Sequence, residues 1–129
     1  MRSGTILRVV RPTDDLAPIR RFYVDALRFP IIYSFEGHEG FDGLIVGVPG
    51  ADHHFAFTRK HGFSAGRAAT PENLLVFYLE DRTVWEDAVA RMRAHGFDPV
   101  EPHNPYWRTN GATFEDADGY RVVLQNSAP

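Results

Sequence analysis

Residues 114–124, which read FEDADGYRVVL, predict a β-hairpin near the end of the chain. A strand over residues 113–115 leads into the turn Asp116–Gly119, and a second strand follows over residues 120–125. Asp and Gly supply the polar side chains and the left-handed backbone that a tight turn requires. The turn also has the first donors of a calcium loop. It lacks the third donor pair and the Glu at the twelfth position, so a plain turn is the better interpretation.

Upstream of this hairpin, one order of elements is predicted twice. The first half is predicted to contain a strand over 6–11, a helix over about 16–27 capped by Asp14 and Asp15, and strands over 31–35, 44–48 and 54–58. The second half is predicted to contain a strand over 74–79, a helix from the capping box Thr83–Glu86 to about His95, a short strand over 97–100 and the hairpin. We therefore expect one α+β domain over residues 1–129, with βαβββ modules at about 6–59 and 74–126 and a linker over 60–73.

Composition excludes several classes of protein. The 129 residues carry a formal net charge of −3 and include no cysteine. A chain without cysteine has no disulfide framework, thiolate zinc site or cysteine nucleophile. No apolar run approaches the roughly 20 residues of a membrane span, and the acidic balance with scattered arginines argues against nucleic acid. We expect a cytoplasmic protein whose partner is a small molecule, and neither a nucleic acid nor a membrane.

Two motifs resemble the signature of a known superfamily. Residues 15–16 read DL and residues 22–29 read FYVDALRF, which is similar to the D-L…F-Y-x-D-x-L-G-F pattern of the vicinal oxygen chelate superfamily, and the hairpin is similar to its closing F-x-D-P-D-G-x-x-x-E-L. The chain departs from these patterns at Arg28, in place of Gly, and at Ala117, in place of Pro. The superfamily contains glyoxalases, extradiol dioxygenases and bleomycin-resistance proteins. The resemblance spans about residues 6–126 and implies two βαβββ modules whose mixed sheets curl into a cup with helices outside, and a homodimer.

The resemblance also implies where a metal ion would bind. In members that use a metal, the first and last strands of each module each contribute one ligand. Those positions carry Arg8, Ala56, Leu74 and Val123 here. A divalent ion needs His or carboxylate donors, and Arg8 would repel it. We therefore expect no metal and no other cofactor.

Strand alternation separates a candidate binding face from an apolar face. If Arg8, Ala56, Leu74 and Val123 face one way, the opposite face is almost purely apolar and should lie under the helices. Their own face mixes small, aromatic and polar side chains, as a ligand-binding cup does. The candidate ligand-binding residues on this face and in a nearby loop are Arg8, His54, Thr58, Tyr78, Tyr106, Trp107 and Arg121.

The leading candidates each have two interpretations. Arg8 provides a counter-charge for an acidic ligand, or it forms an internal ion pair with Glu115 or another carboxylate. His54 hydrogen-bonds a ligand or transfers a proton, or it is simply a histidine at a strand end. Tyr106 and Trp107 stack on a planar ligand, or they cover an edge of the core.

The histidines do not predict a metal site. His53 and His54 are adjacent, so they point to opposite faces of a strand and cannot share one ion. His95 ends a helix, where a cation suits the helix dipole. The remaining histidines lie in predicted loops: His38, His61 and His103.

These observations leave three hypotheses for function. The leading one is a metal-independent protein that binds, and sequesters, a small aromatic antibiotic or metabolite. The alternative is an enzyme of the superfamily, either a glyoxalase-like lyase or isomerase or a dioxygenase, that uses non-standard metal ligands or metal-free acid–base catalysis by His54 or Tyr78. The third is a dimeric regulatory or accessory module without turnover. The fold alone does not decide among them.

Overall fold

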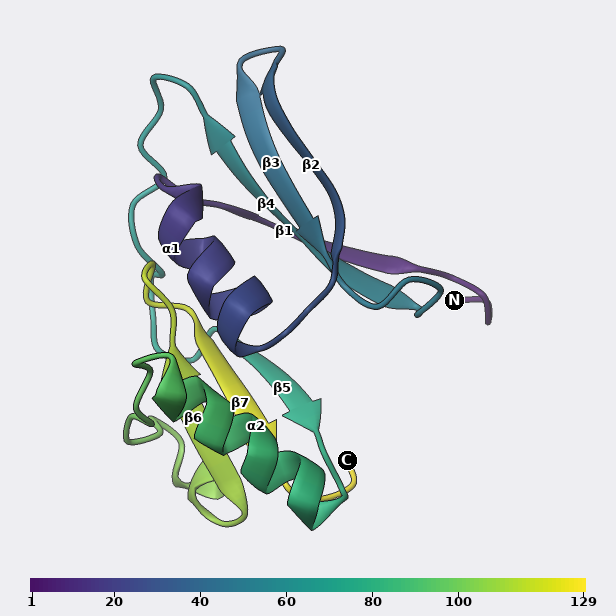
Figure 1. Cartoon of the computed structure of the whole chain (residues 1–129), viewed down its shortest axis with the longest axis vertical. Helices are drawn as coiled ribbons and strands as arrows, with labels where there is room; N and C mark the ends of the chain where they lie inside the picture. Colours follow the sequence, from purple (N-terminus) through teal and green to yellow (C-terminus); the bar gives the residue numbers. More distant parts are fainter. The chain divides into compact units, whose positions relative to one another are not determined.

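The computed structural model describes all residues, 1–129, and divides the chain into two compact units, residues 1–66 and 67–129. Each unit contains one mixed β-sheet and one main helix (Figure 1). The predicted α+β class is therefore confirmed. None of the helices has both the length and the apolar character needed to cross a membrane.

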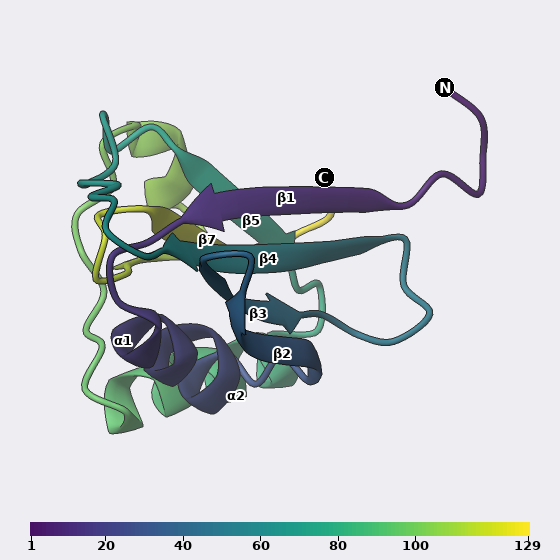
Figure 2. The ribbon, with the colours of Figure 1, turned by 90° about the horizontal axis from the view of Figure 1, so that it is seen from above.

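Unit 1 is built around a four-stranded sheet. Its strands are β1 (Leu7–Pro12), β2 (Ile31–His38), β3 (Phe41–Val46) and β4 (His53–Lys60), in the spatial order β1-β4-β3-β2. Strand β1 pairs with β4 in parallel, and the other two pairings are antiparallel (Figure 2). Strands β2 and β3 are longer than the sequence predicted because the hairpin turn consists only of Glu39 and Gly40. Both have positive φ angles, 49° and 84°, as the favoured two-residue hairpin turns require.

The helix of unit 1 begins where the sequence predicts. Asp15 is its N-cap, and the Asp15 carboxylate accepts a hydrogen bond of 3.1 Å from the Ala17 amide. The helical segment α1 (Leu16–Arg20) continues directly into the wider π-helical η1 (Arg21–Ala26). The buried side of this helix packs on the sheet, with the ring of Tyr23 4.5 Å from that of Phe57.

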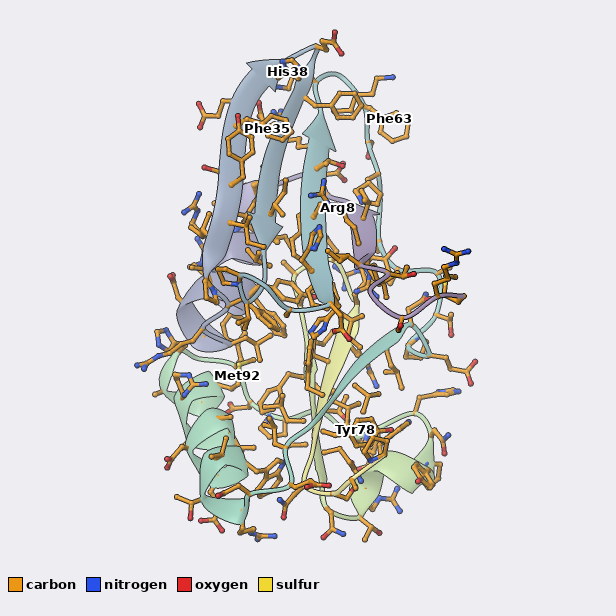
Figure 3. The ribbon with its side chains drawn as sticks, turned by 90° about the vertical axis from the view of Figure 1, so that its right-hand side faces the viewer. Arg8, Phe35, His38, Phe63, Tyr78 and Met92 are labelled. Atoms are coloured by element: carbon orange, nitrogen blue, oxygen red, sulfur yellow. The ribbon has the colours of Figure 1, made fainter.

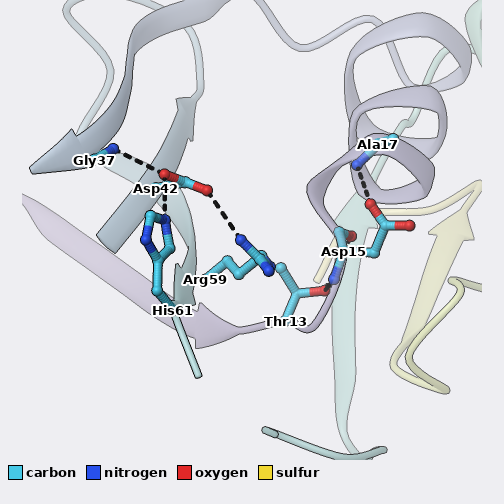
Figure 4. Close-up of polar contacts among 7 residues, drawn as sticks. All are labelled: Thr13, Asp15, Ala17, Gly37, Asp42, Arg59 and His61. Atoms are coloured by element: carbon cyan, nitrogen blue, oxygen red, sulfur yellow. Dashed lines mark hydrogen bonds and ion pairs between the residues drawn. The ribbon is translucent and has the colours of Figure 1, made fainter. Parts of the chain in front are cut away.

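The carboxylate of Asp42 joins the β2–β3 hairpin of unit 1 to the end of β4. Asp42 accepts hydrogen bonds from the Gly37 amide at 2.9 Å and from Arg59 Nη1 at 3.3 Å, and its other contact is His61 Nε2 at 2.8 Å (Figure 4). The bond from the Gly37 amide, followed by that from His61, lowers the pKa of Asp42. The ionised carboxylate therefore links the turn end of the hairpin to the end of β4.

Unit 2 repeats the pattern with a smaller sheet. Its elements are β5 (Leu74–Tyr78), α2 (Arg82–Ala94), η2 (Pro105–Arg108), β6 (Gly111–Glu115) and β7 (Arg121–Gln125), and the strand order is β5-β7-β6. Strands β5 and β7 are parallel, and β6 and β7 form the predicted hairpin. In its turn, Asp116 Oδ1 accepts hydrogen bonds from the amides of Asp118 and Tyr120. The short strand predicted over 97–100 is reduced to one bridge between Val100 and Thr113.

The N-cap predicted for α2 is wrong. The sequence was interpreted as a capping box at Thr83–Glu86, but the helix begins at Arg82 and its N-cap is Asp81, whose carboxylate accepts from the Val84 amide at 3.1 Å. Glu86 instead pairs with Arg82 one turn earlier, at 2.8 Å. The helix ends as predicted before Gly96, which has a φ of 87°.

The segment over 60–73 is attached to both units. On the unit 1 side, Asp14 accepts hydrogen bonds from the amides of Ala65 and Gly66, at 2.6 and 3.2 Å. The bond from Ala65 is the main cause that lowers the pKa of Asp14. On the unit 2 side, Arg67 Nη1 donates to the Ala117 carbonyl at 2.8 Å. Residues 65–67 are thus fixed by hydrogen bonds on each side of the boundary between the units.

Two glycines on the sheets provide a matched test of packing. A Cβ at Gly111 would overlap the backbone carbonyl of Trp107, whereas a Cβ at Gly43 would overlap only the outer atoms of the Phe35 ring. A side chain can move aside more easily than backbone. Gly111→Ala should therefore cost about 1–3 kcal/mol of unfolding free energy, and Gly43→Ala should cost less. Urea denaturation of the two variants tests this order, and an equal or larger loss for Gly43→Ala would contradict it.

The hairpin link should depend on pH. Because the folded pKa of Asp42 is lowered, its contribution to stability is present above the ordinary aspartate pKa of about 3.9. The contribution is lost as the pH falls through that value to the lower folded pKa. Asp42→Asn should therefore lower Tm at pH 7, and the difference from wild type should shrink as the pH falls below the ordinary aspartate pKa. Asp98→Asn, at a side chain that is 83% exposed, is the control. A Tm difference between Asp42→Asn and wild type that persists in acid would contradict this role of the Asp42 carboxylate.

Candidate functional site

The sheet of unit 1 has a helix-covered face and an open face. Rings from the helix region contact Phe55 and Phe57, which places these two residues on the covered face. Successive side chains of a strand point to opposite faces, so His54, Ala56 and Thr58 of β4 point to the open face. The register then assigns the following residues to the open face: Arg8, Val10, Tyr33, Phe35, Phe41, Gly43, Ile45, His54, Ala56 and Thr58. The predicted division of faces therefore holds in unit 1.

Two predicted site residues meet on this open face. Arg8 and His54 are direct partners in the parallel β1–β4 pairing, and Arg8 Nε donates a hydrogen bond of 2.7 Å to His54 Nε2. His54 Nε2 must therefore carry no proton, and the neutral ring holds its proton on Nδ1. The two terminal nitrogens of the exposed Arg8 guanidinium point away from this bond. No carboxylate of unit 1 pairs with Arg8.

Aromatic side chains extend the open face along β2. The Phe35 ring lies across Gly43, in space that any other side chain at that position would need. It is 5.9 Å from the Tyr33 ring and 6.1 Å from the His38 ring, and Figure 3 shows Arg8, Phe35 and His38 on the same side of the sheet. Tyr33 and Phe35 were not among the predicted site residues. Alternate positions of β2 are recognisable in the sequence. The two register shifts between β2 and β3, which determine the residues of β3 that lie opposite Tyr33 and Phe35, are not.

The open face of unit 2 carries the other predicted candidates. The pairings of β5, β6 and β7 put Leu74, Val76, Tyr78, Thr113, Glu115, Arg121, Val123 and Gln125 on one side. Tyr78 is 39% exposed at the end of β5. Arg121 Nη2 contacts Glu115 Oε2 at 3.3 Å, and Arg121 Nη1 donates to the Glu101 carbonyl at 3.2 Å. Glu115, the carboxylate considered as a partner for Arg8, pairs with Arg121 and also with Arg67 at 3.4 Å.

The aromatic pair of unit 2 lies in the short helix η2. Tyr106 is 69% exposed and Trp107 is half-buried, and their rings meet edge to face at 4.8 Å. The Trp107 carbonyl lies directly over Gly111. The η2 segment therefore covers part of the open face of unit 2, with Trp107 facing inward and Tyr106 facing solvent.

Three buried polar atoms on the open face of unit 2 have no hydrogen-bond partner. They are Thr113 Oγ1, Arg121 Nε and Gln125 Oε1. Only Arg121 was among the predicted site residues. Thr113 and Gln125 were not singled out because a strand threonine or glutamine gives no signal in sequence until the pairing and burial around it are known. Unsatisfied buried polar groups are uncommon, and each marks a place where a bound group or water would lower the free energy.

The residues at the four positions where the superfamily resemblance implies metal ligands do not fit a divalent ion. Arg8 and Ala56 lie on the open face of unit 1, and Leu74 and Val123 lie on the open face of unit 2. Three of these side chains have no donor atom and the fourth is a cation, so none can ligate a metal. Nor do three or more His, Asp or Glu side chains gather at one point in the structure.

The histidines other than His54 have separate surroundings. His53 pairs with Asp52 at 3.0 Å and lowers the pKa of that carboxyl, and His61 pairs with Asp42. His103 is 3.9 Å from Glu72, and His95 is the C-cap of α2. His38 lies on the open face of unit 1, beside Phe35.

A cavity of unit 1 lies on the other face. It has a volume of about 830 Å³ and runs between α1 and the β2–β3 hairpin. Charges of both signs line it, including Asp14, Arg20, Glu36, Asp42 and Arg59. Asp14 and Asp42 already accept hydrogen bonds from amide and side-chain donors of unit 1, so these two carboxylates have structural roles.

Comparison with known proteins identifies the family. Residues 7–58 match the YycE-like N-terminal domain, and residues 72–126 match the YycE-like C-terminal domain. The uncharacterized protein YycE of Bacillus subtilis is 40% identical over 121 residues, which cover 94% of this chain and 87% of that protein. A crystal structure of a YycE protein from Bacillus subtilis, of unknown function and provisionally assigned to the glyoxalases and fosfomycin resistance proteins, superposes with a TM-score of 0.90 at 37% identity, over 99% of this chain and 96% of that one.

More distant structures share the fold. Glyoxalase I of Leishmania major has a TM-score of 0.71 at 20% identity, over 95% of this chain and 86% of that enzyme. TnmS3, an antibiotic binding protein from Streptomyces sp. CB03234, has a TM-score of 0.66 at 23% identity, over 97% of each chain. One fold thus serves both an enzyme and a binding protein. The chain belongs to the YycE-like family, and its fold is that of the vicinal oxygen chelate superfamily.

Proposed function

We propose that this protein binds a small molecule with an aromatic part and an oxyanion, without a metal ion, and sequesters it. The observation that carries the proposal is the Arg8–His54 pair, which occupies the open face at the position where metal-using members of the superfamily have their first ligand. A fixed guanidinium there supplies positive charge of the kind that a metal would otherwise supply. It attracts an anionic oxygen and needs no cofactor to do so.

The geometry of the pair favours an oxyanion. His54 takes the Nε–H of Arg8 and thereby fixes the guanidinium plane, which leaves Nη1 and Nη2 for a ligand. A carboxylate or phosphonate accepts two parallel hydrogen bonds from such a fork. Because no carboxylate of unit 1 competes for the fork, a bound oxyanion would complete it.

The aromatic residues of the same face, on β2 and β3, favour a planar group in the same ligand, on the other side of β4 from the oxyanion at Arg8. Tyr33 is 60% exposed and Phe41 is 37% exposed, although both are large apolar side chains on the open face. The Phe35 ring lies over Gly43 on the same face. A face that carries both exposed aromatic side chains and a cation suits an aromatic acid long enough to reach from β2 and β3 to Arg8 on β1.

The enzymatic alternative requires His54 or Tyr78 to transfer a proton in addition to contacting the ligand. His54 would have to release the Arg8 bond before Nε2 could accept a proton from a substrate. Tyr78 is the other acid–base candidate, and it belongs to unit 2. Glyoxalase I and TnmS3 share only the fold with this chain, so they support enzyme and binder equally.

We further propose that the protein acts as a homodimer in the cytoplasm. Strand β1 is an edge of its sheet, and Ile6, Leu7 and Val10 in or beside it are 62%, 58% and 56% exposed. An apolar edge strand is usually covered by another chain or element. A second copy of the protein would cover this edge.

A calorimetric titration of chelator-treated protein with benzoate and phenylphosphonate tests the proposed function. We expect saturable binding without metal. Arg8→Gln should weaken it at least about tenfold, because one charge-assisted pair of hydrogen bonds is lost. Arg2→Gln removes an equal charge from the exposed start of the chain and should leave the affinity unchanged.

His54→Gln distinguishes the binder from the enzyme. Glutamine keeps an oxygen that can accept from Arg8, so in a binding protein the affinity should fall only slightly. In an enzyme that uses the imidazole, any turnover of the ligand would cease while binding persists. Equal affinity of wild type and Arg8→Gln for both probes would contradict the proposal.

A further inference from the structure

A small pocket in unit 2 lies under the η2 segment. Its volume is about 130 Å³, and its lining includes Pro71, Leu74, Pro102, Trp107, Thr113 and Arg121. All of these residues belong to residues 67–129, so the pocket is complete within one unit. It involves neither Arg8 nor His54.

Three neighbouring strands form the floor of this pocket. Leu74 of β5 pairs with Arg121 of β7, and Thr113 of β6 lies diagonally across from Arg121 on the same face. The segment that contains Pro102 and Trp107 forms the roof. Its close approach depends on Gly111, because a side chain there would collide with the Trp107 carbonyl.

Two polar groups in the lining are buried without partners. Thr113 is 3% exposed and its Oγ1 has no hydrogen bond, and the buried Nε of Arg121 has none either. The other nitrogens of Arg121 are held by the Glu101 carbonyl and by Glu115. The guanidinium is therefore fixed in place while its Nε–H remains unused. A buried donor left in this state lowers the stability of the fold, and a bound acceptor would remove that cost.

The charges near the pocket favour an acceptor with negative charge. Arg121 shares Glu115 with Arg67, so one carboxylate serves two guanidinium groups. Glu72 also lines the pocket, and its carboxylate is 3.9 Å from His103 Nε2. The unused groups are an N–H that can only donate and a hydroxyl that can donate. A carboxylate accepts both.

We propose that this pocket binds the carboxylate of a small aliphatic acid, through Arg121 Nε–H and the Thr113 hydroxyl. A cavity of about 130 Å³ has the volume of roughly four water molecules at about 30 Å³ each. It accommodates a carboxylate with two or three carbon atoms. Leu74 and the two prolines give the aliphatic part apolar contacts.

NMR titration with propionate tests this site. We expect the Arg121 Nε–Hε signal to shift and to saturate, and Thr113→Val should weaken propionate about five- to tenfold because one hydrogen bond is lost. Thr113→Val keeps the shape of the side chain and removes a buried unsatisfied hydroxyl, so it should fold at least as stably as wild type. Thr109→Val, at an exposed threonine outside the pocket, is the control and should leave binding unchanged.

The outcomes separate this site from the proposed function. If propionate causes no saturable shift up to about 50 mM, or if Thr113→Val binds it as wild type does, the pocket holds only water and the inference is overturned. Arg8→Gln should bind propionate as wild type does. Failure of benzoate to bind therefore bears on the open face of unit 1, whereas failure of propionate bears on this pocket.

Discussion

The parallel pairing of the first and last strands of each unit is the constraint on which the rest of the structure depends. Parallel strands cannot be joined by a tight turn, so the chain must cross over between them. In each unit this crossover begins with a helix, which covers one face of the sheet and leaves the other open. The same pairing places residue 8 directly beside residue 54, and residue 74 beside residue 121. The site residues are neighbours because of it.

The open faces could be predicted from the sequence because strand alternation has a fixed period. Arg8, His54, Thr58, Tyr78 and Arg121 were assigned to the open faces in advance, and the register agrees with that assignment. The hairpin turn at Asp116–Gly119 was also predictable, since its residues have few other uses. What alternation cannot reveal is which residues touch. The hydrogen bond between Arg8 and His54 depends on the parallel register, which follows from the fold and not from either strand alone.

Other features depended on local competition that the sequence does not resolve. Asp81 and Thr83 both suit an N-cap. The helix begins after the earlier one, and Glu86 pairs with Arg82. Strand β2 extends to His38 because Glu39 accepts a left-handed backbone, which is uncommon for that residue type. The small pocket under the η2 segment could not be predicted from the sequence. Its roof is an irregular segment, and Thr113 becomes informative only when its hydroxyl is seen to be buried without a partner.

Arg8 stands at a position where the resemblance to the vicinal oxygen chelate superfamily implies a metal ligand, and we propose that its guanidinium takes the place of the ion. Isothermal titration of tag-free, chelator-treated protein with Zn²⁺, Ni²⁺, Mn²⁺ and Fe²⁺, one at a time, tests it most directly. The four positions implied as metal ligands carry Arg8, Ala56, Leu74 and Val123. We therefore expect no saturable heat for any of these ions. Binding of one ion per chain with micromolar or tighter affinity would contradict it, and would mean that other residues supply the ligands.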